Sequence, residues 1–490
     1  MPVKRLLAAF MLGAVSVAGF APFHLFFLPI LAIAGLIRIW SEGKGAWTGF
    51  AFGMGLFLSG VSWIYVSLHD FGGMPMPLAL LSTFLFCAFI SLYFALCGYL
   101  QEKLRASPMI RAVLVMPSLL ALTDWLRGWL FTGFPWLALG YSQTGYSPLS
   151  GFAPLFGVYG VSLATAMAGG LVYLLSKKPF RNKAAFLLAA LLLSGYGLKQ
   201  ISWTHPEGKP VTVSLIQGNI PQDRKWNDDT LNDTLDVYMK LAASSNSRLI
   251  ILPETAIPMF RDEVPNEYLE MLAIHGRKNG GDILVGLPER QPNHEQTYYN
   301  SVFNFGVSPP QTYRKSHLVP FGEYLPLEPL FGWLLDAMHM PMSDFSRGSI
   351  DQKPMDAAGE KVAVDICYED VFGEEVIRQL PEATLLVNVS DDAWFGNSIA
   401  PRQHMQISAM RAIETGRMML RATNTGMTAV IDEHGHVLST LPEFREGSLD
   451  SIAQGYSGST PYVRWGNHAF LVLAAVLLAT AAGTSRIRDF

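Results

Sequence analysis

The stretch VAVDICYED, residues 362–370, is a short apolar run that ends at a cysteine, Cys367. An apolar run of this length predicts a buried β-strand, with the cysteine at its carboxyl end. The chain has two other cysteines, Cys87 and Cys97, and both lie in long hydrophobic runs. Cys367 is therefore the one thiol in a region that should face water, and it is the first candidate for a reactive side chain.

The composition around this stretch is that of a membrane protein. Half of the 490 residues are hydrophobic and 16% are charged, which is more apolar than an ordinary soluble enzyme of this length. The net charge is −4, and no basic stripe with interleaved aromatic residues occurs, so we expect no nucleic-acid partner. With one cysteine outside the hydrophobic runs, we also expect no intramolecular disulfide there.

Eight hydrophobic stretches approach the length of about 20 residues that a helix needs to cross a bilayer. The first could instead be a signal peptide, because Lys4 and Arg5 precede it. No small-residue cleavage site follows, however, and a second stretch begins at once, so we expect an uncleaved helix. The predicted spans are residues 6–23, 24–40, 45–68, 76–100, 110–126, 152–175, 184–198 and 467–484.

Lysine and arginine residues between these stretches predict the orientation of the chain, because basic loops stay in the cytoplasm. If the helices alternate, the basic clusters fall on one side, whereas residues 69–75 and 127–150 carry almost no basic residue. This pattern predicts a multi-pass membrane protein with both termini in the cytoplasm. The clusters are Lys4 and Arg5, Arg38 and Lys44, Lys103 to Arg111, Lys177 to Lys183, and Arg486 with Arg488.

The region between the seventh and eighth spans alternates β-rich runs with helical patterns, which is typical of a layered α/β domain. Near its end, residues 432–435 (DEHG) separate two apolar runs and predict the turn of a hairpin. We therefore predict three parts: a membrane domain of seven helices at 1–205, a domain outside the cytoplasm at 206–463, and an eighth helix with a cytoplasmic tail at 464–490. In a Gram-negative bacterium the middle domain would lie in the periplasm.

Three reactive side chains follow predicted strands in this domain. Glu254 closes RLIILPE, Lys315 lies in QTYRKSHLVPFGEY, and Cys367 closes VAVDIC. A free cysteine is mostly protonated near neutral pH and needs a base, which a carboxylate whose pKa burial has raised can provide. A nearby ammonium can stabilise the oxyanion that forms when the thiol attacks an acyl carbon. Taken singly, each residue could equally be structural.

The order Glu254, Lys315, Cys367 at strand ends resembles the nitrilase superfamily, whose fold is an αββα sandwich. The surrounding motifs resemble one membrane-embedded branch, the apolipoprotein N-acyltransferase family. These motifs are LPETAIP from 252, YRKSHLVPFGEYLP from 313, DICYED from 365, SDDAWFG from 390, and, in the membrane part, GFAPF from 19 and FTGFPWLALGYSQ from 131. The resemblance covers nearly the whole chain, with seven spans before the domain and one after it.

The resemblance implies a protein of the bacterial inner membrane that carries out a two-step acyl transfer without a cofactor. No His, Cys or Asp cluster with the spacing of metal ligands occurs, so we also expect no metal. Cys367 would take an acyl chain from a glycerophospholipid, with phosphatidylethanolamine expected, and would pass it to the α-amino group of the diacylglyceryl-cysteine of an apolipoprotein. Glu254 would be the general base and Lys315 the oxyanion stabiliser. Supporting roles would fall to Glu323 in FGEY, to the backbone N–H of Tyr368 as an oxyanion donor, and to Glu369. Glu323 and Glu369 could instead hold Lys315 or a loop by a salt bridge.

An entrance for lipid chains is expected near the site. The apolar stretch 325–342, with Phe331 and Trp333, could form a lid that dips into the membrane surface or could be a packing insertion. Trp226 and Trp394 are entrance candidates that could equally pack in the core. His404 is interpreted either as a residue at a helix start or as a polar residue with its hydrogen bonds satisfied.

Three other functions fit parts of the sequence. A membrane-anchored nitrilase-type amidase would share Glu254, Lys315 and Cys367 but would use water as the acceptor. A transporter or lipid-binding protein should carry ionisable residues within its spans, which are almost free of charge here. A binding module without catalysis would keep its function after Cys367→Ala.

Overall fold

The computed structural model describes residues 3–104, 106–291, 294–326 and 344–486. The chain forms two compact units. The helical unit comprises Met1–Tyr65, Pro77–Ser202 and Thr460–Phe490, and the sandwich unit comprises Trp203–Ser459 together with the short piece Val66–Met76. Most of the stretch 325–342, including Phe331 and Trp333, lies outside the described residues.

Two six-stranded sheets form the centre of the sandwich unit. The first has the order β12-β1-β2-β3-β4-β5 and the second the order β11-β10-β9-β8-β7-β6. The strands of the first sheet are β1 (Thr204–Gln217), β2 (Leu249–Ile251), β3 (Asp282–Gln291), β4 (His294–Gly306), β5 (Thr312–Arg314) and β12 (Gly447–Gly458). Those of the second are β6 (Met355–Ala357), β7 (Glu360–Ile366), β8 (Leu385–Ser390), β9 (Met419–Thr423), β10 (Ala429–Ile431) and β11 (Val437–Thr440).

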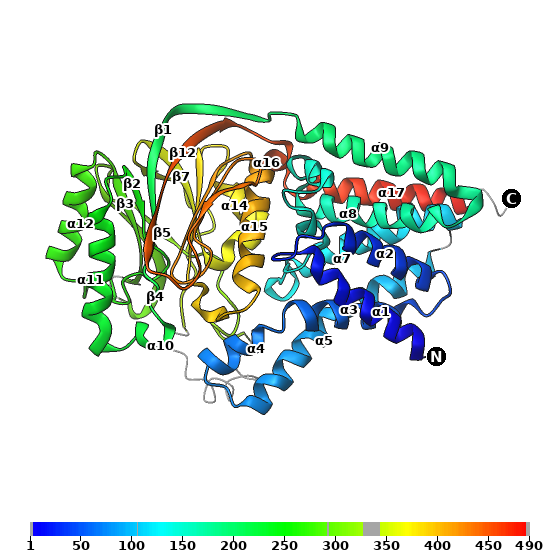
Figure 1. Cartoon of the computed structure of the whole chain (residues 1–490), viewed down its shortest axis with the longest axis horizontal. Coiled ribbons are helices and arrows are strands. Elements are labelled where there is room, and N and C mark those ends of the chain that lie inside the picture. Colours follow the sequence, from blue (N-terminus) through cyan, green and yellow to red (C-terminus); the bar gives the residue numbers. More distant parts are fainter. Residues whose placement is uncertain (1–2, 105, 292–293, 327–343, 487–490) are drawn as a thin grey trace. The chain divides into compact units, whose positions relative to one another are not determined.

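The two sheets pack face to face, and helices cover their outer faces (Figure 1). On β2, Leu249 and Ile251 point into the core between the sheets, while Ile250 points into a second core under the helices. Both faces of this strand are buried, which explains its uninterrupted apolar run. The covering helices are α11 (Asp228–Ser244) and α12 (Asn266–Lys278) on the first sheet, and α14 (Gly373–Val376) and α15 (Ala400–Thr415) on the second (Figure 1). The result is the αββα sandwich that the resemblance implied.

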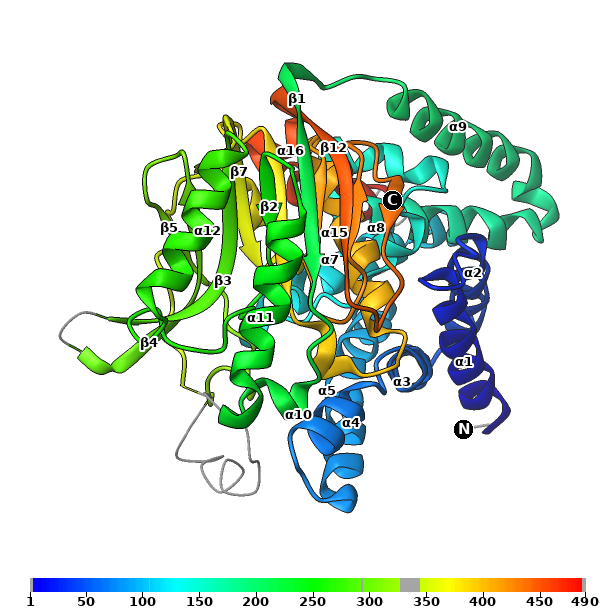
Figure 2. The same cartoon turned by 60° about the vertical axis from the view of Figure 1, so that its left-hand side comes forward.

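The predicted turn at residues 432–435 is confirmed, because β10 and β11 pair antiparallel on either side of it. The sequence did not predict every strand, and β6, β9 and β12 are among those that it missed. Strand β9 contains Arg421 in the middle of an apolar run, and β12 is rich in Ser and Gly, so neither shows a clear hydrophobic pattern. Strand β12 instead owes its place to its long antiparallel pairing with β1 (Figure 2).

The helical unit contains three helical segments long and apolar enough to cross a membrane among the described residues: Met76–Lys103, Pro108–Arg127 and Pro148–Leu175. A fourth span is possible if the segments Gly45–Gly60 and Ile64–Phe71, bent by 58° against each other, count as one. The predicted stretch 45–68 is therefore not one straight helix. The main helices of the helical unit are α1 (Val3–Ser16), α2 (Phe27–Trp40), α3 (Gly45–Gly60), α5 (Met76–Lys103), α7 (Met116–Arg127), α8 (Ala153–Leu175), α9 (Arg181–Lys199) and α17 (His468–Arg486).

Candidate active site

Three strands of the sandwich unit deliver the side chains that the sequence singled out. Glu254 lies three residues beyond β2, Lys315 directly follows β5, and Cys367 directly follows β7. Strands β2 and β5 belong to the first sheet and β7 to the second, so the three residues come from both halves of the sandwich. Glu254 and Lys315 are buried, at 7% and 1% exposure.

Lys315 lies between two carboxylates. Its ammonium donates to Glu254 Oε1 at 3.3 Å and to Glu323 Oε1 at 2.8 Å. The amide nitrogen of Asn300 bridges the same two oxygens, at 2.7 Å from Glu254 and 3.2 Å from Glu323. The other Glu323 oxygen accepts from the backbone N–H of Val319 at 2.8 Å. Glu323 thus holds Lys315 together with Glu254, and Asn300 links the two carboxylates.

A second buried ammonium, Lys225, lies behind Glu254. Lys225 ends the short helix α10 (Gln222–Lys225), forms an ion pair with Asp391, and donates to the backbone carbonyl of Glu254 at 3.2 Å. The backbone N–H of Asp391 donates to Glu254 Oε2 at 2.8 Å. Asn424 completes this group, because its amide donates to Asp391 and to the Ile220 carbonyl. The carboxylate of Glu254 is therefore contacted from strand β4, through Asn300, and from the loops that follow β5 and β8.

These contacts set the charges of the site. Burial alone would raise the pKa of the Glu254 carboxyl, but the ammonium groups of Lys315 and Lys225 outweigh burial and hold that pKa below its usual value. Burial would lower the pKa of Lys315, and the carboxylates of Glu254 and Glu323 raise it instead. Burial, followed by the charge of Glu254, raises the pKa of the Cys367 thiol well above its usual range. The resting site therefore holds a carboxylate, an ammonium and a neutral thiol.

The expectation that burial raises the pKa of Glu254 was wrong. Its physical basis, burial in a low dielectric, is present, but two cations act on one carboxylate. A lowered pKa makes the Glu254 carboxylate a weaker base. It can still accept the thiol proton, because attack on the acyl carbon and loss of the proton proceed together.

The backbone is strained where the loops meet. Cys367 has a φ of +53°, Thr255 next to Glu254 has +46°, and Asn219 and Phe321 have +52° and +62°. Residues other than glycine rarely adopt this left-handed region, and each such residue costs about 1–3 kcal/mol. Four such residues lie near one cluster of charged side chains. This strain indicates that the loops are held in conformations that position these side chains at a cost in local stability.

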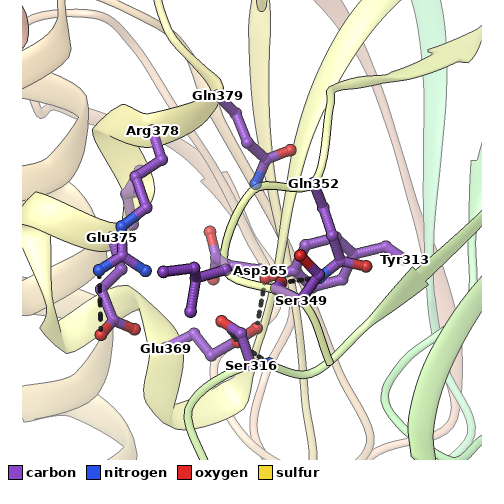
Figure 3. Close-up of a pocket in the computed structure, with 11 residues that line it drawn as sticks. Tyr313, Ser316, Ser349, Gln352, Asp365, Glu369, Glu375, Arg378 and Gln379 are labelled. Carbon is purple, nitrogen blue, oxygen red and sulfur yellow. Dashed lines mark hydrogen bonds and ion pairs between the residues drawn. The ribbon is translucent and has the colours of Figure 1, made fainter. Parts of the chain in front are cut away.

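Glu369 braces the turn that carries Cys367. One of its oxygens accepts from Ser316 and from the backbone N–H of His317, and the other accepts from the Tyr313 hydroxyl and from the backbone N–H of Ile366. Glu369 also lines a small pocket, drawn in Figure 3. With its oxygens engaged in this way, Glu369 ties the loop after β5 to the turn after β7.

The entrance candidates lie apart from these contacts. Trp226 is half-buried and directly follows α10. Trp394 is half-buried in the turn η10 (Asp392–Phe395), and its carbonyl accepts from the Ser67 hydroxyl at 2.8 Å, while its ring meets Phe71 edge-on. The piece Val66–Met76 thus packs on the loop after β8, within the sandwich unit. Among the described residues, no group of three His, Cys, Asp or Glu side chains is placed to hold a metal ion.

Sequence reasoning missed Lys225, Asn300 and Asp391. Lys225 and Asp391 are 166 positions apart in the chain, and a lysine in a polar loop resembles a surface residue. One signal was present: Asn300 and Asp391 each lie in or next to an apolar strand, where an amide or a carboxylate needs a partner.

Comparison with known proteins places the chain in a family. Residues 12–171 match the family described as apolipoprotein N-acyltransferase N-terminal domain, and residues 212–462 match the carbon-nitrogen hydrolase family. The apolipoprotein N-acyltransferase of Nitrosomonas europaea is 54% identical over 97% of this chain and 96% of its own length. Those of Chromobacterium violaceum and Methylococcus capsulatus are 42% and 43% identical, over 97% and 96% of this chain and 93% and 95% of their own. The chain therefore belongs to the apolipoprotein N-acyltransferase family.

Proposed function

We propose that this protein N-acylates apolipoproteins by a two-step transfer through a thioester on Cys367. The observation that carries the proposal is the buried ion pair of Glu254 and Lys315 beside a strained cysteine, in a chain that matches the family along nearly its whole length. The donor is a glycerophospholipid such as phosphatidylethanolamine, and the acceptor is the α-amino group of a diacylglyceryl-cysteine.

In the first step the Cys367 sulfur attacks the ester carbonyl carbon of the phospholipid. Glu254 accepts the thiol proton as the carbon–sulfur bond forms, and the ammonium of Lys315 stabilises the negative charge that develops on the carbonyl oxygen. The ester carbon–oxygen bond then breaks, and Glu254 returns the proton to the leaving glycerol oxygen. The products are a thioester on Cys367 and a lysophospholipid.

In the second step the amine of the lipoprotein attacks the thioester carbon. Glu254 takes a proton from the amine nitrogen, Lys315 again stabilises the oxyanion, and the carbon–sulfur bond breaks. The thiolate recovers the proton from Glu254, and an amide results. Glu323 acts by holding Lys315, and Glu369 acts by holding the turn of Cys367. Trp226 and Trp394 remain proposed contacts of the entering chains.

The proposal includes the membrane topology. Seven spans precede the catalytic domain and one follows it, in the division 1–205, 206–463 and 464–490, with the domain in the periplasm and both termini in the cytoplasm. Both substrates are anchored in lipid by their acyl chains, and extracting a chain costs about 0.8 kcal/mol per methylene. A catalytic domain attached to the bilayer avoids that cost.

Incubation of the purified protein with phospholipid labelled in its acyl chains tests the first step. We expect wild type to carry a label that hydroxylamine removes, as it does from thioesters, and Cys367→Ala to carry none. The Cys97→Ala variant is the matched control, because it removes a thiol of the helical unit, and it should label like wild type. Equal labelling of wild type and Cys367→Ala would refute the mechanism.

A further inference from the structure

A network of buried polar side chains lies directly behind Cys367. Its members come from five parts of the sandwich unit: the turn η8 (Cys367–Val371), strand β8, the turn η10, helix α15 and strand β9. Each is at most 1% exposed. They are Asp370, Asn388, Asp392, His404, Ser408 and Arg421.

The network holds four charged groups without contact with water. Arg421 pairs with Asp392 at 3.0 Å and with Asp370 at 3.4 Å, and the two ring nitrogens of His404 reach the same two aspartates, at 3.1 and 2.8 Å. Well-packed apolar residues often stabilise a core as much as buried ion pairs do. Stability of the core alone therefore gives little reason for this arrangement.

Two members of the network bind the backbone of the nucleophile. The amide of Asn388 donates to the Cys367 carbonyl at 3.1 Å, and Nε2 of His404 lies 3.2 Å from the same oxygen. Burial and Arg421 would lower the pKa of His404, but Asp370 and Asp392 outweigh them and raise it. Nε2 of His404 lies 2.8 Å from an oxygen of Asp370 as well as 3.2 Å from the Cys367 carbonyl, and because both of these oxygens are acceptors, Nε2 carries a proton that it shares between them.

The carbonyl of Cys367 and the N–H of Tyr368 belong to one peptide unit. This unit is planar and trans, because the cis bonds of the described chain are Ala21-Pro22 and Leu380-Pro381. In a trans unit the carbonyl and the N–H point in opposite directions. Hydrogen bonds that hold the Cys367 carbonyl therefore also fix the direction of the Tyr368 N–H. This peptide unit follows Cys367, whose φ of +53° leaves the turn strained.

We propose that His404 and Asn388 are positioning residues that hold this peptide unit so that the Tyr368 N–H faces the oxyanion. This inference rests on the proposed acyl transfer and adds to it the groups that orient the second oxyanion donor beside Lys315. The carboxylates of Asp370 and Asp392 in turn favour the protonated form of His404, and Arg421 orients Asn388 by donating to its amide oxygen. One interpretation of His404 from the sequence was a polar residue with satisfied hydrogen bonds. In the structure its partners include Asp370, Asp392 and the carbonyl of Cys367.

Two reactions of the Cys367 thiol distinguish orientation of the Tyr368 N–H from a purely structural role of His404 and Asn388. Acylation by a p-nitrophenyl ester passes through an oxyanion, and it needs neither phospholipid nor lipoprotein. Alkylation by iodoacetamide displaces iodide from a saturated carbon and forms no oxyanion. Any change that only alters the ionisation or exposure of Cys367 affects both rates, so it cancels in their ratio.

The variants are Asn388→Asp, which keeps the shape and removes the donor, His404→Leu, and His404→Gln, which restores an N–H donor. We expect the ratio of acylation to alkylation to fall about 10- to 100-fold in Asn388→Asp and His404→Leu, and by less in His404→Gln. Thr415→Val is the control on the same helix, since its hydroxyl bonds to Arg411 and not to Cys367, and it should leave the ratio unchanged.

An unchanged ratio in folded Asn388→Asp and His404→Leu would overturn the inference, even if both rates fell. If His404→Leu does not fold, as judged by thermal unfolding, Asn388→Asp decides the question alone. Failure of wild type to react with phospholipid would refute the proposed function while leaving this ratio measurable with the ester.

Discussion

Glu254 shows how the chemistry of one residue depends on loops far from it in the chain. Its carboxylate accepts hydrogen bonds from Lys315, Asn300 and the backbone of Asp391, and its own backbone accepts one from Lys225. Together these contacts keep an ionised base in a buried place. The proposed reaction needs that state, because a protonated Glu254 could not accept the thiol proton.

Removing Lys225 should make this dependence visible in the pH profile. Acylation of Cys367 should fail as pH drops through the pKa of Glu254, which the two ammonium groups hold below its usual value. In Lys225→Met that pKa rises, so the acid limb should move to higher pH. The measurement is the p-nitrophenol burst as a function of pH. Lys225→Arg should keep the wild-type limb, and an unmoved limb in folded Lys225→Met would contradict this role.

The same substitution should also cost stability. Lys225→Met leaves Asp391 as a buried carboxylate without its cation, a loss of about 3–5 kcal/mol for pairs of this kind. The double variant Lys225→Met, Asp391→Asn removes both charges and should recover much of that loss. Chemical denaturation of the four proteins of this cycle measures the coupling. Additive losses would show that the two side chains do not stabilise each other.

Sequence could lead to Glu254 and Cys367 because each follows a short apolar strand, and strand ends can be recognised from local pattern. Lys315 follows the short polar strand β5 and was recognised from its motif, YRKSHLVPFGEYLP. Sequence could not lead to Lys225 or to the partners of Cys367. These contacts form between loops that only the folded sheets bring together, and a buried lysine has no local signature. His404 shows the same limit, since its neighbour Asp370 lies 34 positions away.

At the scale of elements, the end of β2 is held by close contact with β3. A Cβ on Gly286 of β3 would lie 2.4 Å from the Pro253 carbonyl oxygen and 2.9 Å from the Glu254 Cα. The backbone that carries the proposed base therefore lies against a position where no side chain fits. This contact fixes Glu254 relative to the first sheet.

Gly286→Ala should therefore displace Glu254. We expect a loss of stability of about 1–3 kcal/mol, as for other overpacked sites, together with a loss of Cys367 acylation larger than the loss of folded protein. Gly447→Ala on β12 is the control, because its Cβ would meet only Leu441 at ordinary contact distance, 3.8 Å. Thermal unfolding and the p-nitrophenol burst together check this, and unchanged acylation in Gly286→Ala would contradict it.

The sequence predicted the fully buried strands best. Strands β2, β7 and β8 lie between two apolar layers and read as apolar runs. Strands β9 and β12 were not predicted, because Arg421 interrupts the apolar run of β9 and polar residues interrupt that of β12. Arg421 lies in β9 only because Asp370, Asp392 and Asn388 surround its guanidinium, which is a tertiary property.

At the scale of the whole molecule, three helical segments of the described chain are long and apolar enough to span a membrane, and the bent pair could be a fourth. The proposed eight spans also need shorter helices, such as the 14-residue α1 and α2. Hydropathy locates apolar stretches, but it does not reveal where a helix bends, as between α3 and Phe71.

Fusions at chosen positions test the proposed topology. A green fluorescent protein fused after residue 180 should fluoresce, because that loop is expected in the cytoplasm, and alkaline phosphatase there should be inactive. Fusion after residue 209 should give the reverse result. Active phosphatase at both positions, or at neither, would contradict a seventh span between them.

The central claim is that Cys367 carries an acyl chain from phospholipid to an amine. Its most direct test is a single-turnover chase: protein labelled by acyl-labelled phospholipid is freed of donor and mixed with a diacylglyceryl-cysteinyl peptide. We predict that the label leaves Cys367 and appears on the peptide as a hydroxylamine-resistant amide, while a peptide with an acetylated α-amine leaves it in place. Release of the label as free fatty acid at one rate, with or without the peptide, would contradict the claim and identify water as the acceptor.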